Sequence, residues 1–267
     1  MNNTLLLNAI HSQSLHGKKA LIFGASSGLG YACAETLASL GADVVLVARN
    51  QAKLEQAVLQ IKQSFNVKLD YDVQDVTHLD SLAVLLEKHS DTDILITNCG
   101  GPRVAPLASL SLDEWEEAWQ SQIRSVVQSV QTIVPNMVKK GWGRVIMLAS
   151  ITIKNPLKGF ALSNAIRPGL LGLSATLTQE HAHQNITFNL VSPGITRTER
   201  IEKLIQQLMA QGQSESEVIA QLSAKIPSKR LTKAEEVAAM VGFLSSHAAG
   251  AISGQNLIVD GGQSVAD

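Results

Sequence analysis

Short apolar runs alternate with longer amphipathic stretches along most of the chain. Seven runs rich in β-branched and aliphatic residues predict buried strands: Lys19–Phe23, Val44–Val47, Val67–Tyr71, Ile94–Thr97, Arg144–Leu148, Thr187–Val191 and Leu257–Val259. The stretches between them have helical spacing and predict six helices: Gly28–Leu40, Gln51–Phe65, Leu79–His89, Asp113–Val134, Leu170–His181 and Ala234–Ser245. Apolar strands that alternate with helices predict an α/β fold, a doubly wound parallel sheet covered on both faces.

Two segments fall outside this alternation. Residues 1–14 precede the first predicted strand and form an N-terminal extension with no assignable role. Residues 199–226 are amphipathic and predict a helical insertion. The apolar stripe of this insertion, from Ile201 to Leu208, either faces a ligand or docks on the core. No linker or repeat divides the rest, so residues 15–267 are predicted to form one domain.

The composition limits the partners that we expect. Hydrophobic residues make up 45% of the chain and charged residues 17%, an ordinary globular balance that argues against disorder. The net charge is −1 and no extended basic run occurs, so nucleic acid is not an expected partner. No stretch approaches the length of a membrane span, and the apolar piece Leu5–Leu7 is too short for a signal peptide. Cys33 and Cys99 lack metal spacing, and we expect a cytoplasmic protein with no metal site.

The turn after the first predicted strand suits a phosphate group. Residues 24–30 read Gly-Ala-Ser-Ser-Gly-Leu-Gly and lead directly into a predicted helix. Gly24 lets the strand turn sharply, Gly28 lets a pyrophosphate approach the backbone, and Gly30 permits close packing of helix on strand. The helix N-terminus presents free N–H groups and a positive dipole end to phosphates. We predict a dinucleotide site in a Rossmann-like domain, the alternative being a Gly-rich turn without a ligand. The predicted contacts are Gly24, Ser26, Ser27, Gly28, Leu29 and Gly30.

The Gly-x-x-x-Gly-x-Gly spacing resembles that of the short-chain dehydrogenase/reductase family, and ordered matches extend from about Leu15 to Gly262. The resemblance implies that residues 199–226 are a lid over a substrate pocket, and that the chain assembles as a tetramer or dimer. It also implies further cofactor contacts. Asp72 and Val73 are expected near the adenine, and Asn98 and Gly100 beside the cofactor. The contacts expected at the nicotinamide are Pro193, Gly194, Ile195 and Thr198.

The end of the second predicted strand bears on the choice of nicotinamide cofactor. A site for NAD(H) wants an acid there, which accepts a hydrogen bond from the ribose 2′-hydroxyl. This strand ends Val47-Ala48-Arg49-Asn50, without a carboxylate that would repel a 2′-phosphate. The guanidinium of Arg49 has a geometry suited to phosphate, so NADP(H) is preferred over NAD(H). The alternative is a solvated surface arginine.

The resemblance implies a carbonyl reduction, but the chain departs from the family pattern at the reacting positions. In the family a serine holds the carbonyl, a tyrosine donates the proton, and a lysine four residues later lowers the pKa of that tyrosine and binds the ribose. An asparagine on the preceding helix completes a water chain. Ser150 matches the serine, and Gln122 stands at the asparagine position. Ser163 and Arg167 stand where the tyrosine and lysine would be, and a serine hydroxyl is too weak an acid for the tyrosine's role.

The two tyrosines of the chain, Tyr31 and Tyr71, fall outside the expected pocket, so another group is needed as proton donor. Lys154 lies on the loop expected to border the nicotinamide, and partial desolvation would lower its pKa enough for that task. The alternative for Lys154 is an exposed loop lysine. Arg167 either binds the ribose or stabilises an alkoxide electrostatically. Pro168 lacks an N–H and is predicted to kink or restart the helix.

Three functions follow from these observations. The first is an NADP(H)-dependent oxidoreductase that acts on the carbonyl or alcohol group of a small-molecule substrate, with an atypical catalytic site. The second is a non-catalytic dinucleotide-binding or redox-sensing protein, which the loss of the tyrosine and lysine favours. The third is another reaction on the same scaffold, such as isomerisation or elimination. Oxidation of NADPH by a panel of ketones and quinones separates the first two.

Overall fold

The computed structural model of the chain describes residues 14–265, so the predicted extension 1–14 lies outside the described residues apart from Ser14. Seven parallel strands form one sheet, in the order β3-β2-β1-β4-β5-β6-β9. The order reverses between β1 and β4, where the carboxyl ends of the strands open into a crevice. The strands are β1 (Lys19–Phe23), β2 (Asp43–Ala48), β3 (Leu69–Val73), β4 (Ile94–Thr97), β5 (Gly143–Leu148), β6 (Ile186–Pro193) and β9 (Asn256–Val259).

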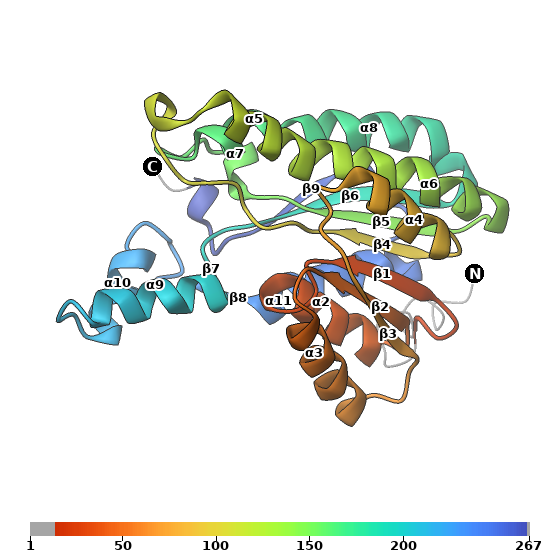
Figure 1. Ribbon diagram of the computed structural model, residues 1–267, viewed down its shortest axis with the longest axis horizontal. Helices are drawn as coiled ribbons and strands as arrows, with labels where there is room; N and C mark the ends of the chain where they lie inside the picture. Colours follow the sequence, from red (N-terminus) through yellow and green to blue (C-terminus); the bar gives the residue numbers. More distant parts are fainter. Residues whose placement is uncertain (1–13, 266–267) are drawn as a thin grey trace.

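Helices cover both faces of the sheet, which confirms the predicted α/β class (Figure 1). One layer consists of α2 (Gly28–Ser39), α3 (Gln51–Ser64) and α11 (Ala234–Ser245). The opposite layer consists of α4 (Leu79–Lys88), α5 (Leu112–Trp119), α6 (Ser125–Lys140), α7 (Ala161–Ile166) and α8 (Gly169–His181). Short 3₁₀ turns occur at η1 (Leu107–Ser109), η3 (Ile151–Ile153), η4 (Ala182–Gln184), η5 (His247–Ala249) and η6 (Gln263–Val265). Within residues 14–265, no helix has the length and apolar character needed to cross a membrane.

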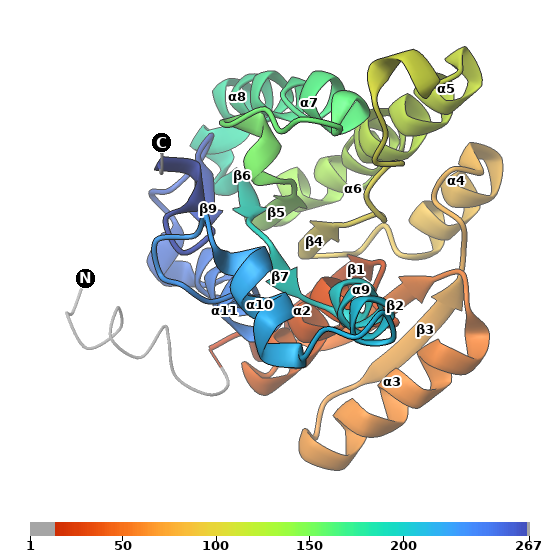
Figure 2. The same ribbon diagram turned by 90° about the vertical axis from the view of Figure 1, so that its left-hand side faces the viewer.

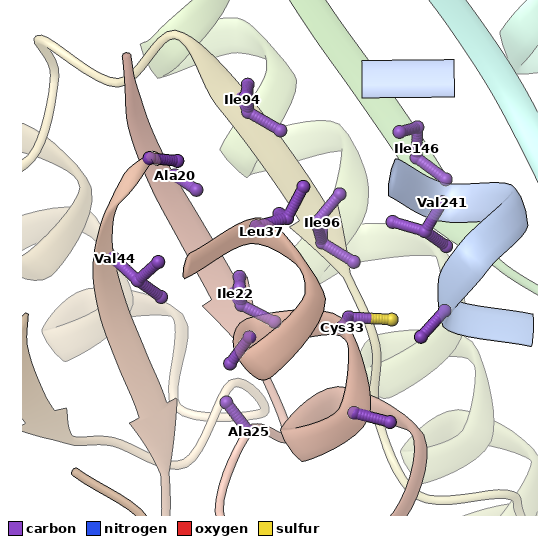
Figure 3. Packing of buried hydrophobic residues seen from close by; sticks show 14 of the residues in the cluster. Ala20, Ile22, Ala25, Cys33, Leu37, Val44, Ile94, Ile96, Ile146 and Val241 are labelled. Atoms are coloured by element: carbon purple, nitrogen blue, oxygen red, sulfur yellow. The ribbon is translucent and has the colours of Figure 1, made fainter. Parts of the chain in front are cut away.

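Alternate residues of each strand supply the two layers of the core. Ala20 and Ile22 of β1 pack toward α2, where they meet Leu37 (Figure 3). Leu21 and Phe23, one residue along, belong to the cluster on the other face. Because both faces of the strand are buried, the sequence is apolar at every position after Lys19, as is usual for a parallel sheet. Full burial of each such side chain stabilises the fold by about 1.5–3 kcal/mol.

Two predicted elements, the third strand and the fourth helix, differ most clearly from the structure. β3 occupies Leu69–Val73, two residues beyond the predicted strand at Val67–Tyr71, because this edge strand is only half-buried and its apolar pattern is weak. The helix predicted over Asp113–Val134 runs on past Pro135 to Lys140. Gly141 then ends it in the left-handed conformation that favours glycine (φ +65°).

The same predicted helix also contains a short π-helix, η2 (Gln120–Arg124), between α5 and α6. The inserted π turn rotates the side chains that follow it relative to a continuous α-helix. At Pro168 the prediction is confirmed, because α7 ends before this residue and α8 restarts at Gly169.

Residues 199–226 fold into two helices, α9 (Glu199–Met209) and α10 (Glu215–Ser223). They follow β7 (Thr196–Arg197), which pairs with β8 (Thr232–Lys233) in a separate two-stranded sheet. The pair projects away from the main sheet in Figure 1 and faces the viewer in Figure 2. A small apolar core of its own holds this segment together: Ile205, Val218, Ile226 and Leu231.

Candidate functional site

Two adjoining hollows open at the carboxyl ends of the strands. The first, here called the nucleotide hollow, has a volume of about 720 Å³ and is lined from the ends of β1, β2 and β4 and the loop after β3. The second, here called the lid hollow, has a volume of about 1000 Å³ and extends from the Gly-rich turn past the end of β5 to α9. The two share Gly24, Ser27, Lys53 and the segment 98–101, so one elongated ligand can occupy both.

The Gly-rich turn begins the shared part of the site. Gly24 (φ +62°) and Gly28 (φ +58°) adopt left-handed conformations that favour glycine. A Cβ on Gly28 would stand 3.6 Å from Cβ of Thr198, in the gap through which a diphosphate must pass. A Cβ on Gly30 would stand only 2.2 Å from the carbonyl oxygen of Gly24, so this glycine permits close approach of helix to strand. The cradle therefore fits a dinucleotide phosphate group.

The nucleotide hollow has a cationic wall at the end of β2. Arg49 lines it with a side chain that is 79% exposed, and its Nη1 lies 3.6 Å from Oδ2 of Asp75. Lys53, one turn into α3, lines the same wall. Asn50 occupies the position before the helix, where its side chain accepts a hydrogen bond from the N–H of Lys53. A phosphate at this wall would meet two cations whose charges are only partly neutralised.

Asp72 and Val73, predicted as adenine contacts, do not line either hollow. Asp72 lies in β3 and is held by Lys88 and His89, on the side of the sheet that α4 covers. The loop that does line the nucleotide hollow begins three residues later and contains Asp75 and Val76. Asp75 and Val76, rather than Asp72 and Val73, therefore stand in the lining of this hollow.

The sequence contained a signal for the corrected position. The dipeptide Asp-Val occurs three times, at 43–44, 72–73 and 75–76, and only the last is followed by a threonine, Thr77. The carboxylate of Asp75 accepts hydrogen bonds from the backbone N–H of Thr77 (3.0 Å) and from its hydroxyl (2.8 Å). This turn around an aspartate side chain is typical of a loop after a strand.

The loop after β4 places an amide and a thiol between the two hollows. Asn98 and Gly100 both line them, as does Cys99, whose thiol donates to the carbonyl of Ser121. Gln122 points inward from the π-helix, is 3% exposed and donates from Nε2 to the carbonyl of Gly100 (3.0 Å). Its amide therefore supports this loop from behind.

Ser150 lines the lid hollow at the end of β5. Its oxygen accepts a hydrogen bond from the N–H of Thr152, which leaves the hydroxyl proton free to donate to a ligand. Ser163, from α7, does not line the hollow. It is buried and shares a 2.8 Å hydrogen bond with the hydroxyl of Thr152. The sequence predictions included both serines and missed Thr152, the residue that joins them.

Arg167 is buried behind Ser150, with 6% of its surface exposed, and it lines the lid hollow. Its Nη1 donates to the carbonyl of Ala149, and its Nε is buried without a partner among the described residues. Burial lowers the pKa of the Arg167 guanidinium. Burying the charge of Arg167 with an unpaired N–H donor costs free energy, unless a ligand provides a hydrogen-bond acceptor.

The structure does not support Lys154 as a proton donor. The 3₁₀ turn η3 carries this residue past the hollow, its side chain is exposed, and neither hollow is lined by it. The partial desolvation that the prediction required is therefore missing. The hydroxyls of the two tyrosines also lie elsewhere, Tyr31 near Glu35 (3.5 Å) and Tyr71 near Glu55 (2.9 Å).

The segment after β6 lines the lid hollow with Pro193, Gly194, Ile195 and Thr198, as expected of the residues beside a nicotinamide. A Cβ on Gly194 would lie 2.8 Å from Cβ of Asp260, so this turn packs closely on the segment after β9. Leu29 of the Gly-rich turn lines the opposite wall, whereas Ser26 lines only the nucleotide hollow. Of the predicted cofactor contacts, Gly30, Asp72 and Val73 line neither hollow, and the others all line at least one of them.

An ion pair joins the nucleotide hollow to the lid. The carboxylate of Glu199, the first residue of α9, accepts from Nζ of Lys53 at 2.7 and 2.8 Å. Lys203 lies 2.9 Å from the same carboxylate. Hydrogen bonds from Lys203, Lys53 and Ser27 lower the pKa of Glu199 to about 2. The first turn of α9 is therefore fixed to the Gly-rich turn and to α3.

The apolar stripe of residues 199–226 divides between the lid hollow and a small core within the segment itself. Leu204 lines the hollow, while Ile205, the next residue, is 1% exposed and packs inside the lid.

Comparison with known proteins places this site in a family. A family model described as "Enoyl-(Acyl carrier protein) reductase" matches residues 24–264, which is most of the chain. The 3-oxoacyl-[acyl-carrier-protein] reductase FabG of Escherichia coli (strain K12) is 33% identical over 250 residues, 93% of this chain and 98% of the relative. The gluconate 5-dehydrogenase of Gluconobacter oxydans (strain 621H) is 30% identical over 256 residues, 94% of this chain and 96% of the relative. The chain belongs to the short-chain dehydrogenase/reductase family.

Solved structures of short-chain dehydrogenases/reductases agree with the fold. The L-sorbose reductase of Gluconobacter frateurii, complexed with NADPH and L-sorbose, has a TM-score of 0.90 and 30% identity, and covers 94% of this chain and 98% of its own. A putative NAD(P)-dependent gluconate 5-dehydrogenase from Beutenbergia cavernae, with bound NADP, has a TM-score of 0.86 and 27% identity. The match covers 96% of this chain and 100% of that one. These relatives are named as oxidoreductases, which supports an enzyme that uses a nicotinamide dinucleotide.

Proposed function

We propose that the protein is an NADP(H)-dependent oxidoreductase that interconverts a carbonyl and an alcohol, with a catalytic site that lacks the Tyr-x-x-x-Lys pair. The observation that carries the proposal is the unbroken pair of hollows, which runs from the cationic end of β2 to Ser150. Arg49 and Lys53 favour the 2′-phosphate of NADP(H) over the 2′-hydroxyl of NAD(H). The Gly-rich turn receives the diphosphate, and Asp75 with Val76 replaces the pair first expected beside the adenine.

The chemistry divides between the cofactor and this chain. When bound, the reduced nicotinamide supplies a hydride to the carbonyl carbon. Ser150 donates a hydrogen bond to the carbonyl oxygen, since its own oxygen already accepts from Thr152. The electron pair of the carbonyl moves to the oxygen, which takes its proton from solvent. Ser163 holds Thr152 in place, and Gln122 supports the loop at Gly100.

The remaining expectations complete this proposal. Residues 199–226 act as a lid that closes the substrate side of the lid hollow. The protein acts in the cytoplasm, without a metal ion, as a dimer or tetramer formed through α5, α6 and α8. Leu112 and Trp119 of α5 support such a contact, because they are 85% and 45% exposed and large apolar side chains are commonly covered by a partner.

The experiment is a cofactor and substrate test on the full chain. Titration of the protein with NADPH and with NADH, followed by nicotinamide fluorescence, should give a dissociation constant at least tenfold lower for NADPH. The Arg49→Gln variant should lose most of that difference, while Lys68→Gln, an exposed lysine outside both hollows, serves as the control. Oxidation of NADPH at 340 nm with a panel of ketones and quinones should then reveal turnover. Equal affinity for both cofactors would refute the NADP(H) assignment.

A second candidate function is a non-catalytic dinucleotide-binding or redox-sensing protein. The observation in its favour is that Ser163 and Arg167, at the positions of the family's tyrosine and lysine, are engaged by Thr152 and Ala149. Tight NADPH binding without oxidation across the whole panel would favour this function over the first.

A further inference from the structure

The charges that line the lid hollow are unbalanced. Among the described residues, its lining contains four cationic side chains, namely Lys53, Arg167, Arg200 and Lys203, and the single carboxylate of Glu199. Lys53 and Lys203 both bind that carboxylate. The carboxylate of Glu199 is therefore already paired with two lysines at the start of α9. Neither arginine of the lining has a carboxylate partner among the described residues.

The two arginines approach the hollow from opposite walls. Arg167 comes from the sheet side, at the start of α8, and no carboxylate of residues 14–265 lies within 4.0 Å of its guanidinium. Arg200 comes from the second residue of α9, and its Nη1 lies 3.1 Å from the position that a Cβ on Gly101 would occupy. The positive charge of Arg200 acts with burial to lower the pKa of Arg167, so the two guanidinium groups lie within electrostatic reach.

Other cations of the lid show that pairing is available there. Arg197, three residues before Arg200, contacts Glu202 and lies 2.7 Å from Glu215. Arg200 has no such ion pair within the described part of the chain, although it lies in the same first turn as Glu202. Its guanidinium lies beside Gly101, and both residues line the lid hollow. The arrangement leaves this one lid arginine available to a ligand.

The lid hollow also has an apolar wall, formed by Val104, Leu157, Phe160, Ile201 and Leu204. Arg167 is only 6% exposed and gains little solvation from water, so a bound anion compensates for its desolvation through paired hydrogen bonds. The side chain of Arg200 is exposed and stays solvated until a ligand binds. The buried and unpartnered Nε of Arg167 is a donor that such an anion, or a water bound to it, can satisfy.

The phosphates of the cofactor do not account for this cationic pair. In the proposed binding mode they bind the Gly-rich turn, Arg49 and Lys53, in the nucleotide hollow and in the part that the two hollows share. Arg167 and Arg200 line the lid hollow, as does Ser150, beside which the reacting carbonyl is expected. An anion at that place is therefore a part of the substrate.

We propose that the substrate is an oxo acid, a carbonyl compound whose carboxylate binds Arg200, with Arg167 as the second positive charge and with a short aliphatic or aromatic body against the apolar wall. This rests on the proposed function. The reaction then converts the oxo acid, NADPH and a proton into the hydroxy acid and NADP⁺. Two electrons pass with the hydride to the carbonyl carbon, and the proton goes to the carbonyl oxygen.

The test compares acids with neutral analogues of the same carbon skeleton. The probes are 4-methyl-2-oxopentanoate, 3-oxohexanoate and 2-oxo-4-phenylbutanoate, each with its primary amide. Binding to the NADP⁺-loaded protein is measured by calorimetry, and turnover with NADPH at 340 nm. We expect at least one acid to bind about tenfold or more tightly than its amide, the range of a charge-assisted hydrogen-bond pair. Arg200→Gln should remove that difference and leave amide binding unchanged.

The control variant is Lys225→Gln, which removes a lid cation outside the hollow and should change neither affinity. Equal binding of acids and amides, no binding of any acid, or unchanged acid binding by Arg200→Gln would each overturn the proposal. Failure of the proposed function looks different. In that case NADPH is not bound, or neither the neutral ketones nor the acids oxidise it. Turnover of neutral ketones with no preference for acids contradicts the oxo-acid substrate alone.

Discussion

A single methyl group at residue 30 should damage both the stability and the cofactor site of this protein. In a Gly30→Ala variant the new Cβ would stand 2.2 Å from the carbonyl oxygen and 2.6 Å from the carbonyl carbon of Gly24. Ordinary van der Waals contact for such an atom begins near 3.4 Å. The shortfall exceeds 1 Å, and both opposing atoms are backbone, so no side chain can turn away to relieve it. Either α2 or the Gly-rich turn must move.

The magnitude follows from two opposing effects. Alanine is a better helix former than glycine by about 1 kcal/mol, and this gain favours the variant. Overpacking of a close contact costs about 1–3 kcal/mol, and a clash between backbones lies at or above the upper end of that range. We expect a net loss of about 2 kcal/mol, which lowers the melting temperature of a domain of this size by about 4–8 °C.

Cofactor binding should suffer in addition, because the displaced turn holds the diphosphate. A loss of about 1.4 kcal/mol there raises the dissociation constant for NADPH tenfold. Thermal and urea unfolding measure the first effect, and nicotinamide fluorescence measures the second. Gly172→Ala is the matched control, since Gly172 lies in the exposed face of α8 with no atom within 4 Å of the added Cβ. That variant should be slightly stabilised, by about 0.5–1 kcal/mol, with unchanged NADPH affinity. A Gly30→Ala protein with wild-type stability and affinity would refute the packing argument.

Three further predictions concern other parts of the molecule. Burial and the nearby Arg144 lower the pKa of His247, so the imidazole binds a proton more readily in the unfolded chain than in the folded one. The free energy of unfolding should therefore fall as the pH drops below about 6.5. His247→Gln should reduce this pH dependence, measured as the midpoint of urea unfolding. Burial raises the pKa of the Cys33 thiol to about 12 and also raises the pKa of Cys99, which lines the hollows. A disulfide reagent at pH 7.5 should therefore modify Cys99 slowly, and bound NADP⁺ should slow that reaction further. Rapid modification of Cys33 would contradict its burial. Ile205→Ala should remove the centre of the lid core and increase proteolysis within residues 199–226 more than it lowers the main unfolding temperature.

Much of the fold could be predicted because the sheet is buried on both faces. The short apolar runs of β1 and β4 favour buried strands, and each predicted strand lies at its place in the sheet. Prediction failed at β3, an edge strand whose alternate residues meet solvent and whose boundaries are set by pairing with β2. The tertiary pairing of Val44 with Leu69, rather than the local pattern, determines that register.

The site could be predicted where the backbone makes it and not where side chains complete it. Gly24, Gly28 and Gly30 are required by the conformation of one turn, so local spacing was sufficient. Lys154 illustrates the opposite case, because a position four residues past Ser150 says nothing about which way a 3₁₀ turn carries the side chain. Thr152 was missed for the same reason: only the folded chain brings its hydroxyl to Ser163, eleven residues away.

The electrostatics of the site depend on local pairing and not on net charge. A net charge of −1 argues against long-range attraction of anions, and for nucleic acid that argument still applies. At short range the outcome is decided by which cations already have a carboxylate. Arg197 and Lys203 have one, and their charges are largely neutralised on the lid surface. Arg167 and Arg200 have none among the described residues, and the first of them is almost fully desolvated. Because Coulomb energies increase as the local dielectric falls, the buried charge of Arg167 acts more strongly on a nearby anion than the exposed, paired charges do, and this difference supports the proposed anionic substrate.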